Sequence, residues 1–144
     1  PIQDRGYKAL TQSLIDQGFD LDFSKLLNAV RINFNQYLER RNNDLLETTY
    51  ATVLRSLLGE MGYSKVNTRF VRKALNAFFA HTQENWFLED DVIPVLRILK
   101  ENKYNLGIIS NAGDTQDVLN LVKKFGIKSF FDFIPLDHFH IYYK

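Results

Sequence analysis

Ser110 and Asn111 stand where a hydroxyl and free backbone N–H groups would come together. They follow the apolar, β-branched run at 106–109, which is typical of a buried strand, and a helical pattern begins near Asp114. Open α/β sheets bind their ligands beyond the carboxyl ends of their strands, and a helix N-terminus there favours an anion. The sequence therefore predicts an anion site at Ser110, Asn111 and Ala112.

Other interpretations of the polar residues stay open. Ser110 could merely end the strand while Asn111 forms an Asx-turn. His138 and His140 would share one face of an extended segment and could bind a metal, although two His near a chain end are more typical of a solvated tail. The two Asp residues at 90–91 fit charges at a helix N-terminus better than a metal pair.

The first part of the chain shows uninterrupted helical periodicity. Apolar residues three and four apart predict helices over about 6–17, 23–40, 44–61 and 67–83. Four helices with short connections indicate a small bundle, so residues 1–85 are predicted to form a helical domain.

Candidate capping residues mark the ends of these helices. Asp22 and Asn67 are expected to cap the second and fourth helices, because their side chains accept bonds from free N–H groups. Asp44 and Glu47 have capping-box spacing, so the third helix is expected to open there. The glycines expected to end the first and third helices are Gly18 and Gly62.

From residue 86 the pattern changes to an alternation of helices and strands. A helix with Asp91 as its N-cap is expected to end at Asn102 in a left-handed conformation. Strands are predicted over 105–110 and 130–134, with a helix between them. This alternation is typical of a parallel sheet with crossover helices, so residues 86–144 are predicted to form an α/β domain.

Composition excludes several classes of protein. The 144 residues carry a formal net charge of +1, which gives no electrostatic footprint for nucleic acid or an anionic membrane. The absence of Cys excludes disulfides and thiol chemistry and favours the cytoplasm. No apolar run approaches the ~20 residues of a membrane span. We therefore expect a cytoplasmic protein that binds neither nucleic acid nor a membrane.

Four features occur in a recognisable order. A helix beginning Asp91-Val-Ile-Pro is followed by the strand that ends in Ser110-Asn111, then by Phe125-Gly-Ile and by Phe131-Asp-Phe-Ile. Together they resemble the middle of a haloacid dehalogenase-like hydrolase, in which a strand ends in Ser/Thr-Asn. Residues 1–85 are similar to the helical cap domain of many members. The resemblance implies a Rossmann-like, doubly wound parallel α/β sheet, incomplete here, with an all-helical cap.

The resemblance also implies a chemistry. It implies that the Ser110 hydroxyl and the following backbone N–H groups hold a phosphoryl oxygen, whose charge fixed donors stabilise. It further implies a small phosphorylated substrate, Mg²⁺ as cofactor and attack by a carboxylate on phosphorus. The expected function is a phosphatase for a small phosphorylated metabolite. Dehalogenation of a haloacid, which needs no Mg²⁺, is an alternative.

The family's nucleophilic Asp and its acid/base Asp cannot be matched, so no catalytic residue is identified. The segment Asp20-Leu-Asp22 has the right spacing, but it follows the end of a helix and is expected to be a turn between helices. Asp137 and Lys144 match neither a metal ligand nor the family's phosphate-binding Lys. The Mg²⁺ ligands are therefore expected to lie outside this chain.

Two kinds of function remain open. The chain could be a fragment of an active hydrolase, or a truncated relative that no longer catalyses. In the second case it would be a binding or interaction protein. The exposed edge of its incomplete sheet could then recruit another chain or a second copy as a homo-oligomer.

Overall fold

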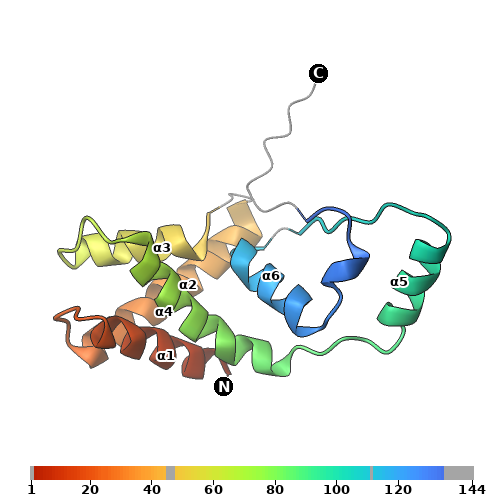
Figure 1. Ribbon diagram of the computed structural model, residues 1–144. Helices are drawn as coiled ribbons and strands as arrows, with labels where there is room; N and C mark the ends of the chain where they lie inside the picture. Colours follow the sequence, from red (N-terminus) through yellow and green to blue (C-terminus); the bar gives the residue numbers. More distant parts are fainter. Residues whose placement is uncertain (1, 45–47, 111, 135–144) are drawn as a thin grey trace. The chain divides into compact units, whose positions relative to one another are not determined.

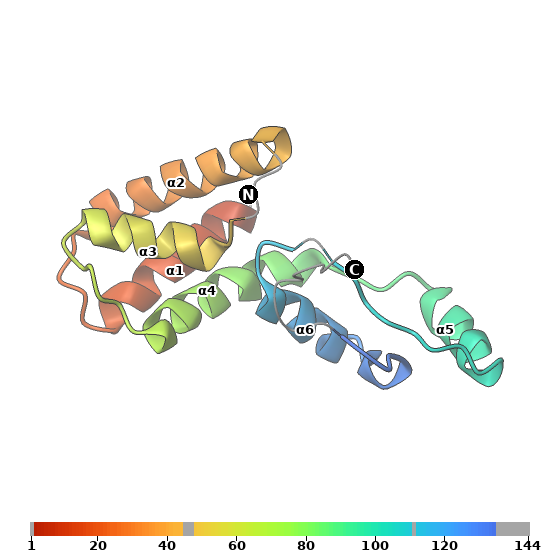
Figure 2. The ribbon, with the colours of Figure 1, turned by 90° about the horizontal axis from the view of Figure 1, so that it is seen from above.

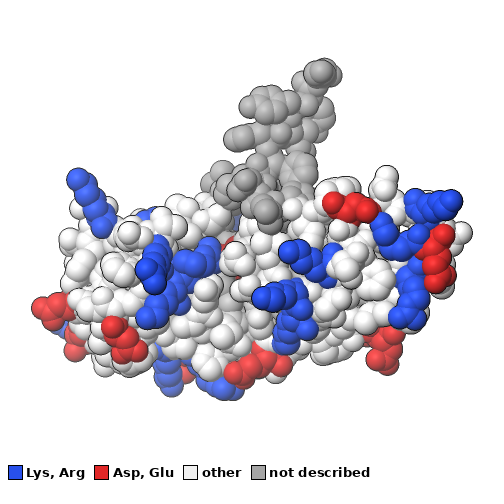
Figure 3. All heavy atoms as spheres, in the orientation of Figure 1, with Lys and Arg blue, Asp and Glu red and all other residues white. Residues whose placement is uncertain are grey.

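The computed structural model describes residues 2–44, 48–110 and 112–134 (Figure 1). The chain divides into two compact units, residues 1–85 and 86–144. Of the helices in these described ranges, none is long and apolar enough to cross a membrane. Acidic and basic side chains both occur on the face drawn in Figure 3.

The first unit contains the four helices that the periodicity predicts. They are α1 (Ile2–Asp16), α2 (Phe23–Asp44), α3 (Tyr50–Glu60) and α4 (Thr68–Thr82), followed by the short 3₁₀ helix η1 (Gln83–Asn85). α1 contacts α2 and α4, and α3 contacts the same two helices (Figures 1 and 2). Each helix therefore has two neighbours within the unit.

A continuous apolar core fills the space between these helices. Phe34 is fully buried, and its ring lies 5.9 Å from Tyr7, 5.1 Å from Tyr50 and 5.6 Å from Phe78, measured between centroids. Edge-on and tilted aromatic pairs add about 0.5–1.5 kcal/mol each to the effect of burial. The other large side chains that are fully buried are Leu10, Leu14, Leu26, Val30, Leu54, Leu58, Leu75 and Val71.

Most of the predicted helix ends are confirmed. Asp22 Oδ1 accepts a hydrogen bond from Lys25 N at 2.8 Å, and Asn67 Oδ1 accepts one from Arg69 N at 2.8 Å. Gly18 and Gly62 follow their helices with φ of 89° and 97°. A residue with a Cβ is sterically strained in that left-handed region, whereas glycine is not, which is why glycine ends these helices.

The predicted start of the third helix is wrong. α3 begins at Tyr50, and its N-cap is Thr49, whose hydroxyl accepts a bond from Thr52 N at 3.1 Å. Asp44 is instead the last residue of α2, and Glu47 lies outside the described residues. Capping-box spacing indicates an N-terminus only where the preceding helix has already ended, and α2 continues to Asp44.

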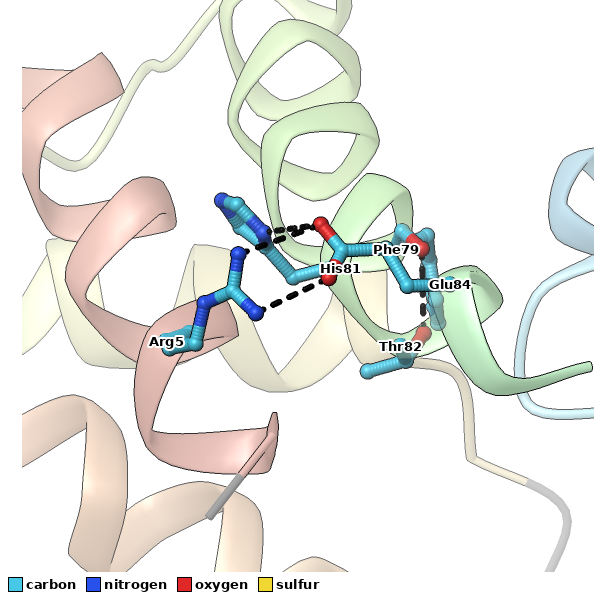
Figure 4. Close-up of polar contacts among 5 residues, drawn as sticks. All are labelled: Arg5, Phe79, His81, Thr82 and Glu84. Atoms are coloured by element: carbon cyan, nitrogen blue, oxygen red, sulfur yellow. Dashed lines mark hydrogen bonds and ion pairs between the residues drawn. The ribbon is translucent and has the colours of Figure 1, made fainter.

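A polar contact joins the two ends of the first unit's chain. Arg5 of α1 donates to Glu84 over 2.9 and 3.3 Å, and His81 Nδ1 lies 2.9 Å from the same carboxylate (Figure 4). The hydrogen bond to His81 and the charge of Arg5 lower the pKa of Glu84. This exposed contact ties the start of α1 to η1, directly after α4.

The second unit contains α5 (Val92–Glu101), α6 (Thr115–Lys124) and the 3₁₀ helix η2 (Lys128–Phe130). Asp91 occupies the predicted N-cap position of α5, but its side chain makes no capping bond. The left-handed residue after α5 is Lys103, with φ of 61°, whereas Asn102 has φ of −82°. The Asn102 side chain donates instead to Ile98 O at 2.8 Å.

The two predicted strands do not form a sheet among the described residues. A single isolated bridge joins Gly107 and Phe133, and it runs parallel, the direction that the sequence predicts. The predicted strand at 130–134 starts late, because η2 occupies its first residue. The doubly wound sheet is therefore not shown here. Parallel pairs need further strands and helices on both faces, so two short segments alone give only a bridge.

Candidate functional site

Ser110 lies just beyond the parallel bridge. Leu106 O accepts from Asp132 N at 2.8 Å, and Ile108 donates to Phe133 O at 3.3 Å, so the paired stretch ends one residue before Ile109. Ser110 is exposed, and its hydroxyl makes no hydrogen bond with any residue in the described ranges. Asn111 lies outside the described residues. The hydroxyl is thus available at the carboxyl end of the paired stretch.

The backbone that follows Ser110 supplies further donors. Ala112 is half-buried and Gly113 is buried, and no described residue accepts from either amide. Amide N–H groups and a hydroxyl at one point can hold an anion, because each donates along a fixed direction.

The helix N-terminus next to this point is already capped by the protein. Asp114 is 5% exposed, and its Oδ1 accepts from Asp117 N at 3.0 Å at the start of α6. The N-cap residue Asp114 and Asp117 in the first turn therefore place two carboxylates at this helix N-terminus, where the sequence suggested that an anion would be favoured. These carboxylates already interact with the positive end of the α6 dipole. An anion at Ser110 would therefore depend on the hydroxyl and the nearby amides.

A cluster of opposite charges lies at the other end of the paired stretch. Lys100 Nζ donates to both oxygens of Asp132 at 2.8 Å, and Asp132 Oδ2 accepts from Leu106 N at 2.7 Å. The hydrogen bonds from Lys100 and Leu106 lower the pKa of Asp132. Four extended residues separate Leu106 from Ser110, on the order of 13 Å, so Asp132 is a clamp for the bridge rather than a partner of Ser110.

No metal site is found among the residues that the structure describes. No three His, Asp or Glu side chains in these ranges gather closely enough to hold an ion. Asp90 and Asp91 are exposed in the turn before α5. Asp137, His138, His140 and Lys144 lie outside the described residues. The described residues therefore do not form a site that fits Mg²⁺.

Residues 19–138 match the family described as haloacid dehalogenase-like hydrolase. This match covers most of the 144 residues. The chain belongs to the haloacid dehalogenase-like hydrolase family. No curated protein and no solved structure matches it significantly. The family assignment confirms the resemblance, and it implies an α/β fold, whereas the described residues show mainly helices.

The family match includes Asp20 and Asp22, whose spacing resembles that of a catalytic pair. Both lie in the connection between α1 and α2. The Asp20 amide donates to the Tyr63 hydroxyl at 2.9 Å, and the Asp22 carboxylate accepts from Lys25 N. This is the turn between helices that the sequence predicts, and a capping carboxylate at an exposed turn is not placed as a nucleophile.

The sequence interpretation missed the clamp formed by Lys100 and Asp132. A signal was present, because Asp132 is the one charged residue in the apolar run Phe130-Phe-Asp-Phe-Ile134. The Asp132 side chain is exposed, and a carboxylate at such a position can accept hydrogen bonds from a cationic side chain and from a backbone N–H. Its partner on α5 could not be identified from spacing alone, because 32 residues separate the two.

Proposed function

We propose that this member of the family contributes the phosphoryl-holding part of a phosphatase for a small phosphorylated metabolite. The proposed phosphate contacts are the Ser110 hydroxyl and the backbone N–H groups of Asn111 and Ala112. The observation that carries the proposal is the exposed hydroxyl of Ser110 just past the parallel bridge, which makes no hydrogen bond with any described residue. Fixed donors at such a point stabilise the charge of a phosphoryl oxygen.

We assign a different role to each of the two compact units. Residues 1–85 would act as the helical cap, which excludes water and contacts the substrate, and residues 86–144 would belong to the α/β core. The sequence offers no match for the family's nucleophilic Asp, and the acidic residues that follow Ser110 most closely in the chain, Asp114 and Asp117, belong to the N-terminus of α6. We therefore infer that these 144 residues bind phosphate without hydrolysing its esters.

Phosphate titration followed by amide NMR tests the site. The signals of Ser110 and Ala112 should move first and saturate in the millimolar range, since the donors are few and exposed. Ser110→Ala should weaken binding about tenfold, because a hydrogen bond to a charged group contributes about 1.5 kcal/mol. Ser129→Ala is the matched control, since Ser129 is an exposed serine of the same unit. Equal effects of the two variants, or signals that do not move, would refute the site.

A specific observation favours a second candidate, a non-catalytic binding protein. Gly107 and Ile109 alternate with Leu106 and Ile108, whose backbone groups bond to residues 132–133. The backbone groups of Gly107 and Ile109 themselves make no hydrogen bond with a described residue. The Ile109 side chain is 82% exposed. An unpaired apolar edge of this kind can accept another strand or a second copy. Sedimentation across a concentration range separates the candidates, since self-association abolished by Ile109→Lys supports the edge.

A further inference from the structure

One face of α5 carries apolar residues that its own unit does not cover. Val95 is 48% exposed and Ile98 is 57% exposed, and no residue of α5 is buried. The two residues are three apart, so they are neighbours on the surface of the helix. A second face, with Val92, Leu96 and Leu99, is half-buried. A helix with apolar residues on more than one face is typical of a helix that is covered on more than one side.

The exposed apolar pair lies at the centre of α5. Val95 comes three residues after the first residue of the helix, Val92, and Ile98 comes three residues before the last, Glu101. A pair centred in this way meets itself when two copies of the helix lie antiparallel, with Val95 of each copy against Ile98 of the other. Such a contact has twofold symmetry, in which the same patch serves on both copies.

Charge differs between the two ends of α5. Glu89, Asp90 and Asp91 precede the helix and are all exposed. Residues 97–103, at the other end, include three basic residues and one acidic residue. Antiparallel pairing therefore places the acidic end of each copy against the basic end of the other, which gives the contact electrostatic complementarity. These charges also suit the dipole of α5 itself, and the variants below separate the two effects.

Asp90 and Lys103 occupy matching positions at the two ends. Asp90 lies two residues before Val92, and Lys103 lies two residues after Glu101. Both are exposed, and neither makes an ion pair with a residue in the described ranges. Both side chains can therefore reach a second copy.

From this arrangement we propose that two copies of this chain associate through α5, with the two helices antiparallel and Val95 and Ile98 at the centre of the contact. Asp90 of each copy faces Lys103 of the other. The ten residues of α5 span about 15 Å, so the contact is small and its dissociation constant is about 0.1–1 mM. The inference rests neither on the Ser110 site nor on the unpaired edge at Ile109.

Sedimentation equilibrium at concentrations up to about 1 mM tests the apolar centre of the contact. Every chain in the experiment carries Ile109→Lys, so that the edge at Ile109 does not contribute. Ile98→Lys should weaken self-association about tenfold or more, because it places like charges at the centre of the contact. The matched control is Ile32→Lys on α2, where Ile32 is 47% exposed, and it should change the association less than about twofold. Circular dichroism reports whether each variant folds.

Charge reversal tests the antiparallel arrangement. Asp90→Lys and Lys103→Glu should each weaken self-association about fivefold at low salt, and the two changes in one chain should restore it, because opposite charges then face each other again. The two single changes alter the net charge in opposite directions, so a general effect of net charge cannot weaken both. If the charges acted only through the α5 dipole, the second change would add to the first instead of reversing it.

Amide NMR on dilution locates the contact. The signals of Val95 and Ile98 should shift with concentration, while the signal of Ile32 stays still. The proposal is overturned if the Ile109→Lys chain stays monomeric at millimolar concentration or if the α5 signals do not shift. It is also overturned if Ile32→Lys weakens association as much as Ile98→Lys, or if the double charge reversal does not restore it.

Discussion

The two units differ in how they bury their apolar residues. In the first unit every helix has two neighbours, and Phe34 and the leucines around it are fully buried. In the second unit α5 has no buried residue, and Ile98 and Ile109 are 57% and 82% exposed. A helical bundle can cover its own apolar stripes, whereas a parallel sheet depends on further strands and on helices over both faces. The first unit thus carries its own stability, and the second presents surface that needs covering.

The largest effect expected from this contrast is at Phe34. Phe34→Ala should lower the free energy of unfolding by about 3–5 kcal/mol, because it leaves a cavity among three aromatic rings. Ile98→Ala in the second unit should change it by no more than about 0.5 kcal/mol, since that side chain is mostly exposed. Urea unfolding followed by circular dichroism measures both. Similar losses of unfolding free energy at the two positions would contradict the proposed difference between the two units.

A pair of glycines sharpens the comparison inside the bundle. A Cβ at Gly6 would lie 2.8 Å from Phe78 Cδ2 and 3.1 Å from the Phe78 carbonyl oxygen, so α1 and α4 would have to separate. Gly6→Ala should therefore destabilise the unit by about 1–3 kcal/mol.

Gly59 in α3 is the matched control. A Cβ there meets nothing within 4 Å, so Gly59→Ala should stabilise the unit by about 0.5–1 kcal/mol through its better helix propensity. Thermal unfolding of the two variants should shift in opposite directions. A stabilising Gly6→Ala would show that the close approach of α1 and α4 is not needed.

Gly107 offers the corresponding test in the second unit. A Cβ there would overlap the Phe133 ring, so Gly107→Ala should displace the ring and open the parallel bridge. Exchange of the Ile108 amide, which donates to Phe133 O, should become about tenfold faster, as the loss of about 1.4 kcal/mol requires. The unfolding of the first unit should not change.

The clash at Gly107 has its own control. Phe133→Ala removes the ring that a Cβ would meet, so in that background Gly107→Ala should cause no additional change in the exchange of the Ile108 amide. An additional change of the same size would show that the ring is not the cause.

The smallest expected effect is the pH dependence of the clamp at Asp132. The hydrogen bonds from Lys100 and the Leu106 N–H lower the pKa of this carboxyl in the folded state. Its contribution is therefore present above the ordinary pKa of aspartate and is lost as the pH falls through the lowered value. The Leu106 amide shift should report this loss. Asp132→Asn should remove the transition, and an unchanged transition would assign it to another group.

Helix periodicity and capping chemistry predicted most of the first unit, because both patterns depend only on residues within one or two helical turns of each other. Asp22, Asn67 and the two terminal glycines occur where their local chemistry requires. The start of α3 was missed because it depends on how far α2 continues. The apolar run at 106–109 predicted a strand, but a sheet also requires partners that no local pattern supplies.

The candidate site was predicted only in part. The position of Ser110 after an apolar run could be read from the sequence, and its exposure agrees with a binding role. The cap formed by Asp114 and Asp117, which occupies the neighbouring helix N-terminus, shows its effect only once the backbone is placed. Sequence spacing indicates which groups lie near Ser110 in the chain. The folded backbone decides which N–H and hydroxyl donors remain available to bind an anion.

Turnover of an aryl phosphate with Mg²⁺ tests most directly the claim that this chain holds a phosphoryl group but has no nucleophile. The account predicts no turnover above background, because donors alone supply about 3–4 kcal/mol of the ~8–23 kcal/mol that enzymes need. The chain would be compared with Ser110→Ala and with Asp20→Asn. Turnover that Asp20→Asn abolishes would contradict the account, since Asp20 and Asp22 would then be the catalytic pair.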